Sequence, residues 1–280
     1  LTADPSVSVC LLEAGPLNDT EKDIRQPSAF PLALHKYSSH ETTLPQQGCG
    51  GREVALPRAR VLGGSSSIVP NVYMRGNRRD YDEWAVDGVD GWAWDDVLPF
   101  FTKGENNAHG KSDLHGVGGP MHVGDTKHVH ELTKTFVTAA AEQGIPRQYD
   151  FNGEEQDGSG MYQVYSEGGH RQSVADAYLT PVLPRDNLKI IDRCLVDQLL
   201  FDEQNFCTGA TYIRNGKHHR AYSNAGVILC GGTIGSPQIL LRSGIGAANY
   251  LEHIDIKPRV NLYGVGENLH DHCLGAGNIY

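Results

Sequence analysis

The sequence predicts an α/β fold, and three patterns lead to that prediction. Residues 7–12 and 227–230 are short runs of β-branched residues and leucine that end in turn residues, as buried strands do. Residues 63–67 are all glycine or serine, and they interrupt apolar sequence. Residues 231–237 are also glycine-rich and stand between a predicted strand and a predicted helix, which is the order of a βα unit.

Length and composition limit the functions that this chain can have. The 280 residues could form one large or two ordinary domains, and 39% hydrophobic with 21% charged residues is typical of globular proteins. A formal net charge of −10 argues against nucleic acid or an anionic membrane surface as a partner, because both favour clustered lysine and arginine. The sequence has no apolar run of about 18 residues that would predict an integral membrane segment.

Cysteine and histidine usage predicts neither disulfides nor a metal site. The six cysteines are far apart and form no Cys-x-x-Cys pair, so we expect buried, reduced thiols, which slightly favours a cytoplasmic location. The sequon Asn18-Asp19-Thr20 fixes no compartment, since such triplets are common. No carboxylate or cysteine stands at a zinc-like spacing around the histidine pairs, which are His128 with His130, His218 with His219 and His270 with His272.

The chain is organised around residues 58–76, which read RARVLGGSSSIVPNVYMRG. Two glycines and three serines follow Val61 and Leu62, so backbone amides and hydroxyls can approach a phosphate-bearing ligand without interference from Cβ atoms. A flexible surface turn would have the same composition. Strand-like residues resume at Val72, however, and this favours a cofactor loop within ordered structure.

An acidic residue, Glu13, ends the first predicted strand. In a dinucleotide-binding fold, a carboxylate at the end of the second strand accepts hydrogen bonds from the ribose hydroxyls. An ordinary strand-end charge is the alternative. The G-x-G-x-x-G fingerprint expected about 20 residues earlier would precede Leu1. The glycine runs at 244–249 and 264–269 lack its third glycine. We therefore expect this chain to be a fragment that does not bind the cofactor tightly on its own.

These motifs resemble those of the glucose-methanol-choline (GMC) family of FAD-dependent oxidoreductases. Residues 58–76 are similar to its first signature, and residues 232–246, GTIGSPQILLRSGIG, fit its second signature at every defining position. Other segments resemble further motifs of the family and follow the family's order. They are residues 81–101, 115–123, 151–153, 169–179 and 264–272.

One departure from the family pattern affects the cofactor loop. The family's Asn and the Gly after it fall on Val69 and Pro70, while an asparagine appears two places later as Asn71. Proline lacks an N–H and valine lacks a side-chain amide, so two possible donors are lost. We expect Asn71 to turn inward and replace the lost group. Degradation of the site is the alternative.

The remaining elements follow from periodicity and turn signals. We predict a helix within 128–143 that ends at Gly144, and strands at 188–191, 195–201 and 209–213. Ser236 is the predicted N-cap of a helix over 238–242, with Pro237 in its first position. Two earlier helices, the second capped by Asp95 and Asp96, are predicted to bury an aromatic and apolar stripe made of Tyr81, Trp84, Val97, Phe100 and Phe101.

The resemblance implies a Rossmann-like FAD-binding domain interleaved with part of an α+β substrate-binding domain. It places the first part of the FAD-binding domain at 1–76, connecting and substrate-domain segments at 77–184, and the second part of the FAD-binding domain at 185–280. The residues implied to bind FAD, with the backbone of Val196 at the adenine, are Glu13, Val61, Gly63, Gly64, Ser65, Val69, Pro70, Asn71, Val72, Val196, Gly232, Asn268 and Asp271.

The implied reaction is oxidation of a small-molecule alcohol to an aldehyde or ketone by hydride transfer to the flavin, with an electron acceptor that the sequence leaves open. The family's catalytic histidine belongs to a portion beyond Tyr280, so we assign no catalytic residue and no metal ligand. Two alternatives remain open: a flavoprotein resembling a hydroxynitrile lyase, which runs no redox cycle, and an inactive truncated fragment.

Overall fold

The first predicted strand is present as β1 (Val9–Leu12), and its partner comes from far along the chain. β1 pairs in parallel with β11 (Leu188–Ile191), so that Val9 lies opposite Leu188 and Leu12 opposite Ile191. The side-chain amide of Asn187 supports the pair from one end, because its Nδ2 donates to the carbonyl oxygen of Val7 at 2.8 Å. The predicted strands at 7–12 and 188–191 are therefore confirmed as β1 and β11, and their pairing is a finding of the structure.

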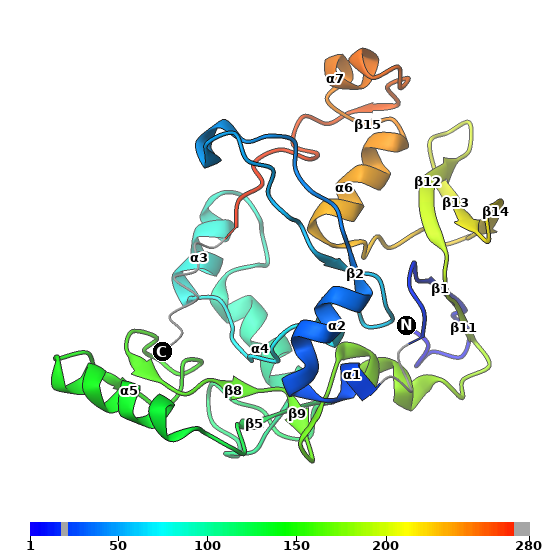
Figure 1. Ribbon diagram of the computed structural model, residues 1–280. Helices are drawn as coiled ribbons and strands as arrows, with labels where there is room; N and C mark the ends of the chain where they lie inside the picture. The colour runs from blue at the N-terminus through cyan, green and yellow to red at the C-terminus, as the bar shows by residue number, and fades with distance from the viewer. Residues whose placement is uncertain (18–21, 272–280) are drawn as a thin grey trace. The chain divides into compact units, whose positions relative to one another are not determined.

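The computed structural model describes residues 1–17 and 22–271. They fall into two units, Leu1–Asp192 and Arg193–Tyr280, and each is taken by itself (Figure 1). The sequon at 18–20 lies outside the described residues, as does His272. Every helix in the described part of the chain is too short or too polar to span a bilayer.

Short helices and one core cluster surround the cofactor loop in the first unit. The core cluster consists of Ile24, Ala33, Tyr37, Val61 and Ile68, all nearly inaccessible to solvent. Its elements are α1 (Lys22–Arg25), η1 (Pro27–Ala29), α2 (Phe30–Tyr37) and η3 (Gly64–Ser67), with β2 (Ser38–Ser39) pairing antiparallel to β3 (Arg58–Ala59) and η2 (Gln47–Cys49) between these strands. Both ends of the loop apex are thus anchored in packed apolar residues.

Two helices follow the loop, α3 (Arg78–Val86) and α4 (Trp94–Gly104). Asn77 caps α3 in a capping box with Asp80. The cap predicted for α4 is wrong: Ala93 is the N-cap, and Asp82 of α3 accepts a hydrogen bond from the Trp94 N–H at 3.0 Å. A carboxylate from the neighbouring helix therefore replaces the expected local cap.

The aromatic stripe on these helices is only partly buried. Val97 is buried, but Trp84 is 45% and Phe100 is 73% exposed, so the prediction that they are core residues is wrong. Trp94 occupies the interior instead, in contact with Tyr81 and Phe101. Helical spacing thus identified an apolar stripe, but it could not show which of its residues the structure covers.

A small mixed sheet forms the second core of the first unit, with Met121, Val123 and Ala177 buried together. β5 (Met121–Asp125) lies between β4 (Glu105–Asn107), which is parallel to it, and β8 (Gln163–Val164), which is antiparallel. The predicted helix is confirmed as α5 (Glu131–Glu142). The other elements are β6 (Arg147–Gln148), β7 (Ser159–Gly160), β9 (Ser166–Glu167), β10 (His170–Arg171), η4 (Ala175–Leu179) and η5 (Thr180–Val182).

The described part of the second unit, residues 193–271, contains an antiparallel three-stranded sheet and two helices. The predicted strands are confirmed as β12 (Leu195–Phe201) and β13 (Cys207–Arg214), and β14 (Lys217–Tyr222) completes the sheet. α6 (Gly232–Arg242) and α7 (Ala248–His253) follow, with β15 (Ile245–Gly246) parallel to β16 (Val260–Asn261).

Three expectations are corrected by the structure. Residues 227–230 form no strand, and Ile228 is 71% exposed. α6 begins at Gly232 rather than after Ser236, whose hydroxyl accepts a hydrogen bond from the Gly231 N–H at 3.0 Å and so supports the first turn from inside the helix. Cys10 and Cys230 are exposed free thiols rather than buried ones.

Candidate functional site

The apex of the cofactor loop is a tight turn that needs its two glycines. Gly63 has φ +91° and Gly64 has φ +58°, both in the left-handed region. A Cβ at Gly63 would stand 2.5 Å from Ser67 Oγ, whereas a Cβ at Gly64 would meet no atom within 4 Å. The Ser66 hydroxyl donates to the Gly63 carbonyl oxygen at 2.6 Å and fixes the turn internally. The backbone at Gly64 is therefore open to a ligand.

Glu13 and this loop are brought together at Gly15. The Gly15 N–H donates to Glu13 Oε1 at 2.8 Å, and the Leu62 N–H donates to the Pro16 carbonyl oxygen at 3.0 Å. A Cβ at Gly15 would stand 1.8 Å from the Arg60 carbonyl oxygen. The end of β1 and the start of the loop are thus in direct backbone contact, as a shared cofactor site requires.

Glu13 itself is half-buried at the end of β1. Burial raises the pKa of its carboxyl group, although the N–H groups of Gly15 and Ala14 act in the opposite direction. A carboxylate has about four acceptor positions, so it retains capacity for further donors. This environment suits a carboxylate that accepts hydrogen bonds from hydroxyl groups of a ligand.

An apolar hollow of about 180 Å³ adjoins the same segment. Its walls come from β11, from the turn after η4 and from the loop itself, and the lining residues are Leu17, Leu62, Leu179, Thr180, Leu183, Leu188 and Ile190. Ligand sites are mostly apolar with a few placed polar groups. The hollow beside Leu62 therefore extends the candidate site.

The region that departs from the family pattern is ordered around Asn71. Asn71 is 1% exposed and has φ +68°, which is tolerated by asparagine better than by most residues. Its Oδ1 accepts a hydrogen bond from Arg171 Nη1, and its Nδ2 donates to the Tyr165 carbonyl oxygen at 3.4 Å. The side chain does turn inward, but it binds protein groups there. A contact between Asn71 and a cofactor stays a prediction.

The other implied loop residues differ in how they could act. Val61 is fully buried in the core cluster, so only its backbone could face a ligand. Ser65 and Pro70 are exposed. Val69 is half-buried and its carbonyl oxygen accepts from Arg171, while Val72 is 39% exposed and forms a bridge with Val164.

A buried network of charges lies directly after the loop. Arg75 Nη2 is 2.8 Å from Glu105 Oε1, and both side chains are 1% exposed. The distance makes a strong ion pair, although the N–H is not directed at the oxygen. The same guanidinium donates through Nη1 to the Leu114 carbonyl oxygen at 2.6 Å. Arg75 therefore fixes the end of the cofactor loop to two later segments.

His115 extends this network to the surface. Its Nδ1 lies 3.0 Å from Glu105 Oε1, with Asn107 Nδ2 also 3.0 Å away, and its Nε2 lies 2.9 Å from Asp150 Oδ2. The hydrogen bond to Glu105 is the main cause of a raised pKa at His115, with burial opposing it and Asp150 adding to it. Two carboxylates facing one imidazole favour its doubly protonated form.

We expect the unfolding free energy to fall as pH rises above 6.5 because of His115. A folded-state pKa above the ordinary 6.5 gives stability that is complete below 6.5 and lost as pH passes the raised value. Urea unfolding at several pH values between 6 and 9 measures this, with His115→Gln as the comparison. A variant with the same pH slope as the unchanged chain would contradict it.

The stability that Glu105 contributes has the opposite pH dependence. Burial alone would raise its pKa, but hydrogen bonds from His115 and the Gly116 N–H, together with the charge of Arg75, lower it. Its contribution is therefore present above the ordinary value of 4.5 and lost only as pH falls through the lowered value. Titration of Glu105 thus does not interfere with a measurement above pH 6.

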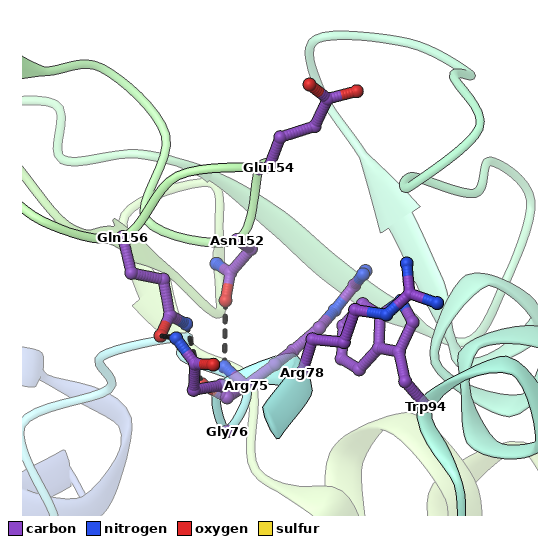
Figure 2. A pocket seen from close by; sticks show the side chains of 9 residues that line it. Arg75, Gly76, Arg78, Trp94, Asn152, Glu154 and Gln156 are labelled. Atoms are coloured by element: carbon purple, nitrogen blue, oxygen red, sulfur yellow. Dashed lines mark hydrogen bonds between the residues drawn. The ribbon is translucent and has the colours of Figure 1, made fainter. Parts of the chain in front are cut away.

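Amide side chains clamp the backbone on the other side of Arg75 (Figure 2). Asn152 Oδ1 accepts from the Arg75 N–H at 2.7 Å, and its Nδ2 donates to the Tyr73 carbonyl oxygen at 3.1 Å. Gln156 Nε2 lies 3.4 Å from the Arg75 carbonyl oxygen, while Glu154 points away. The hollow here is about 50 Å³, which has room for water rather than for a cofactor.

The implied residues of the second unit lie on separate segments. Val196 is on β12 opposite Tyr212, and its carbonyl oxygen accepts from Arg242 of α6 at 3.4 Å. Gly232 begins α6 with φ +76° and is exposed. Asn268 and Asp271 are exposed in the segment after β16.

Sequence reasoning assigned no role to several buried polar residues that fix the loop. Arg75, His115, Asn152 and Arg171 each stand within a motif quoted above, and Glu105 follows α4. The available signal was a charged or amide residue inside an otherwise apolar or glycine-rich motif. Among residues 1–17 and 22–271, no three His, Cys, Asp or Glu side chains are grouped to hold a metal ion.

The residues of the first unit fit a dinucleotide such as FAD. The open backbone at Gly64 allows close approach, Glu13 has acceptor capacity left, and the apolar hollow lies beside Leu62. Open glycine backbone for phosphates and a carboxylate for ribose are the combination that dinucleotide sites use.

Comparison with known proteins gives one consistent result. A family model described as GMC oxidoreductase matches residues 13–274. The chain is 41% identical over 280 residues to the mitochondrial choline dehydrogenase of Mus musculus, covering 97% of this chain and 47% of that protein. The chain thus spans about half the length of the curated relatives it matches.

Solved structures agree with the sequence comparison. The crystal structure of pyridoxine 4-oxidase from Mesorbium loti has a TM-score of 0.87 and 32% identity, covering 93% of this chain and 52% of that one. An FAD-dependent oxidoreductase from Chaetomium thermophilum also has a TM-score of 0.87, with 30% identity over 94% of this chain and 47% of that one. These structures share a mixed α/β architecture with the chain.

Proposed function

The chain belongs to the GMC oxidoreductase family, and on that premise we propose that it supplies much of the FAD site of a longer flavoprotein that oxidises alcohols. The observation that carries the proposal is the backbone contact at Gly15, which joins Glu13 to the loop containing Gly63 and Gly64. These are the two elements that a dinucleotide needs from this part of the fold.

The proposed roles of the chain's residues follow from their positions. Glu13 accepts hydrogen bonds from the ribose hydroxyls, and the backbone from Gly63 to Ser65 approaches the cofactor where no side chain intervenes. In the second unit, Val196 contributes backbone contacts to the adenine, and the segment of Asn268 and Asp271 covers the flavin. We assign residues 1–76 and 185–280 to FAD binding and 77–184 to connecting and substrate-domain segments.

The reaction that fits is oxidation of a CH–OH group to an aldehyde or ketone. FAD, when bound, supplies the acceptor for the hydride. This chain's contribution is to bind and orient the cofactor, and we assign it no proton-transferring residue. The substrate class is a small alcohol, as in the relatives that are named choline dehydrogenases.

The test uses the longer protein, purified with FAD, under anaerobic conditions. Adding an alcohol such as choline should bleach the flavin absorbance near 450 nm as hydride is transferred. Persistent flavin colour with every alcohol in a panel would contradict the proposal, and cyanohydrin cleavage without bleaching would favour a lyase. FAD titration of the 280-residue chain alone should give weak binding, with a Kd above the micromolar range.

We expect Glu13→Gln to weaken FAD binding by the longer protein at least tenfold. A carboxylate paired with ribose hydroxyls makes charge-assisted bonds of about 1.5–3 kcal/mol each, and about 1.4 kcal/mol is a factor of ten. Flavin fluorescence quenching measures the Kd. The matched control is Glu267→Gln, an exposed carboxylate, which should change Kd less than twofold. Equal effects of the two variants would remove Glu13 from the cofactor site.

A further inference from the structure

Arg171 is a buried arginine that binds the cofactor loop from behind. It belongs to β10 and is only 4% exposed. Its Nε donates to the Ile24 carbonyl oxygen at 2.8 Å, at the end of the core cluster around α1. Its Nη1 donates to the Ser66 carbonyl oxygen at 3.2 Å and also to the carbonyl oxygen of Val69 and to Asn71 Oδ1. One guanidinium therefore joins the core to three successive points of the loop.

These bonds determine which way the loop backbone faces. A peptide group is planar, so fixing a carbonyl oxygen also fixes the direction of the following peptide nitrogen. Arg171 holds the carbonyl groups of Ser66 and Val69 on the interior side. The same side chain holds Asn71 in its left-handed conformation through Oδ1. The outer side of the turn is thereby left to Gly64 and Ser65.

Charge pairing does not explain why an arginine is buried here. No carboxylate in the described part of the chain forms an ion pair with Arg171, although the charge of Asp176 acts on its guanidinium and opposes the effect of burial on its pKa. Its Nη2 is buried and has no hydrogen-bond partner among the described residues. Burial lowers the pKa of Arg171, and a buried charge without a direct ion pair is costly, so charge pairing alone does not account for this residue.

We propose that Arg171 is a positioning residue for the cofactor loop: its guanidinium fork sets the shape of residues 63–72 that receives FAD. The proposal rests on the proposed function for its ligand and on the hydrogen bonds above for its geometry. Lysine would retain the charge but not the planar fork, which binds the Ile24 carbonyl oxygen through Nε while Nη1 binds the loop.

The first experiment measures the loop without any cofactor. Hydrogen exchange of the chain follows the amides of Ile68 and Val69, both of which donate to the Ser65 carbonyl oxygen. Arg171→Lys and Arg171→Gln should each accelerate their exchange at least tenfold. The β12 and β13 amides of the second unit serve as the internal reference, and Val123→Ala, which opens the separate core around β5, is the stability-matched control.

The second experiment measures FAD in the longer protein. Both Arg171 variants should raise the FAD Kd at least tenfold and shift the absorption bands of whatever flavin remains bound. Val123→Ala should lower the melting temperature while it leaves the Kd and the bands unchanged. A merely structural role for Arg171 predicts that all three variants behave like Val123→Ala, which would overturn the proposal.

The outcomes separate this inference from the proposed function. Unchanged loop exchange in Arg171→Lys overturns the positioning role even if the unmodified longer protein binds FAD. Accelerated loop exchange supports it even if the unmodified protein binds no FAD, a result that would instead reject the proposed function. If the Arg171 variants fail to fold, Asn71→Gly decides, because it removes one acceptor and keeps the left-handed turn. Loop exchange at least threefold faster supports the proposal, and unchanged exchange contradicts it.

Discussion

Replacing Arg75 by methionine is expected to destabilise the chain by about 3–5 kcal/mol, because it leaves Glu105 buried without its cation. Both side chains are 1% exposed, and the Arg75 Nη2 atom lies 2.8 Å from Glu105 Oε1. The change also leaves the Leu114 carbonyl oxygen without the hydrogen bond from Arg75 Nη1. Urea unfolding followed by circular dichroism measures the loss.

The matched control for this prediction is Arg78→Met, three residues along the chain. Arg78 is 61% exposed and pairs with Asp82 and Asp95 at the surface, so its loss should cost less than about 1 kcal/mol. A double-mutant cycle with Glu105→Gln should show a coupling of about 2 kcal/mol or more between the two buried residues. If Arg75→Met lowers the unfolding free energy no more than Arg78→Met does, the buried pair does not stabilise the chain as expected.

Gly15→Ala is expected to cost about 3 kcal/mol or more, the upper end of the usual range for overpacking. The added Cβ would stand 1.8 Å from the Arg60 carbonyl oxygen and 2.3 Å from the Val61 nitrogen, so backbone must move. That movement separates Glu13 from the cofactor loop. We therefore expect loss of stability together with faster hydrogen exchange at Leu62, whose N–H donates to Pro16.

Gly48→Ala is the control for the glycine change. A Cβ at Gly48 would meet nothing within 4 Å, so this variant should change stability by less than about 0.5 kcal/mol. Thermal unfolding of both variants makes the comparison. A Gly15→Ala chain that melts at the same temperature as Gly48→Ala would show that the loop and β1 are not in firm contact.

Local patterns predicted strands that have a partner among the described residues, whether that partner is near in sequence, as for β12, or remote, as for β1 and β11. The strand at 195–201 was predicted at the bounds that β12 has, because β13 pairs with it through a short connection. Residues 227–230 have equally strong strand character but form none, since a strand needs a partner for its backbone groups. The start of α6 was misplaced because Ser236 supports the helix from within its first turns instead of capping it.

The residues of the candidate site also differ in whether the sequence could predict them. Glu13 and the glycine loop could be found because dinucleotide chemistry demands a particular residue type at each place. Arg171 could not be found in this way, because its partners Ile24 and Ser66 are remote in sequence and are ordinary residues that act through carbonyl oxygens. The pairing of Arg75 with Glu105 likewise depends on how β4 packs against the loop.

The pairing of β1 with β11 also governs how the first unit can be made. Residues 9 and 188 must meet before either strand has a neighbour in the parallel pair, so this contact has a very long sequence separation. At a synthesis rate of about 5–20 residues per second, β1 leaves the ribosome roughly 10–40 s before β11 exists. During that interval β1 lacks its partner β11. Closure of the parallel pair therefore depends on a contact that can form only after residue 191 has been made.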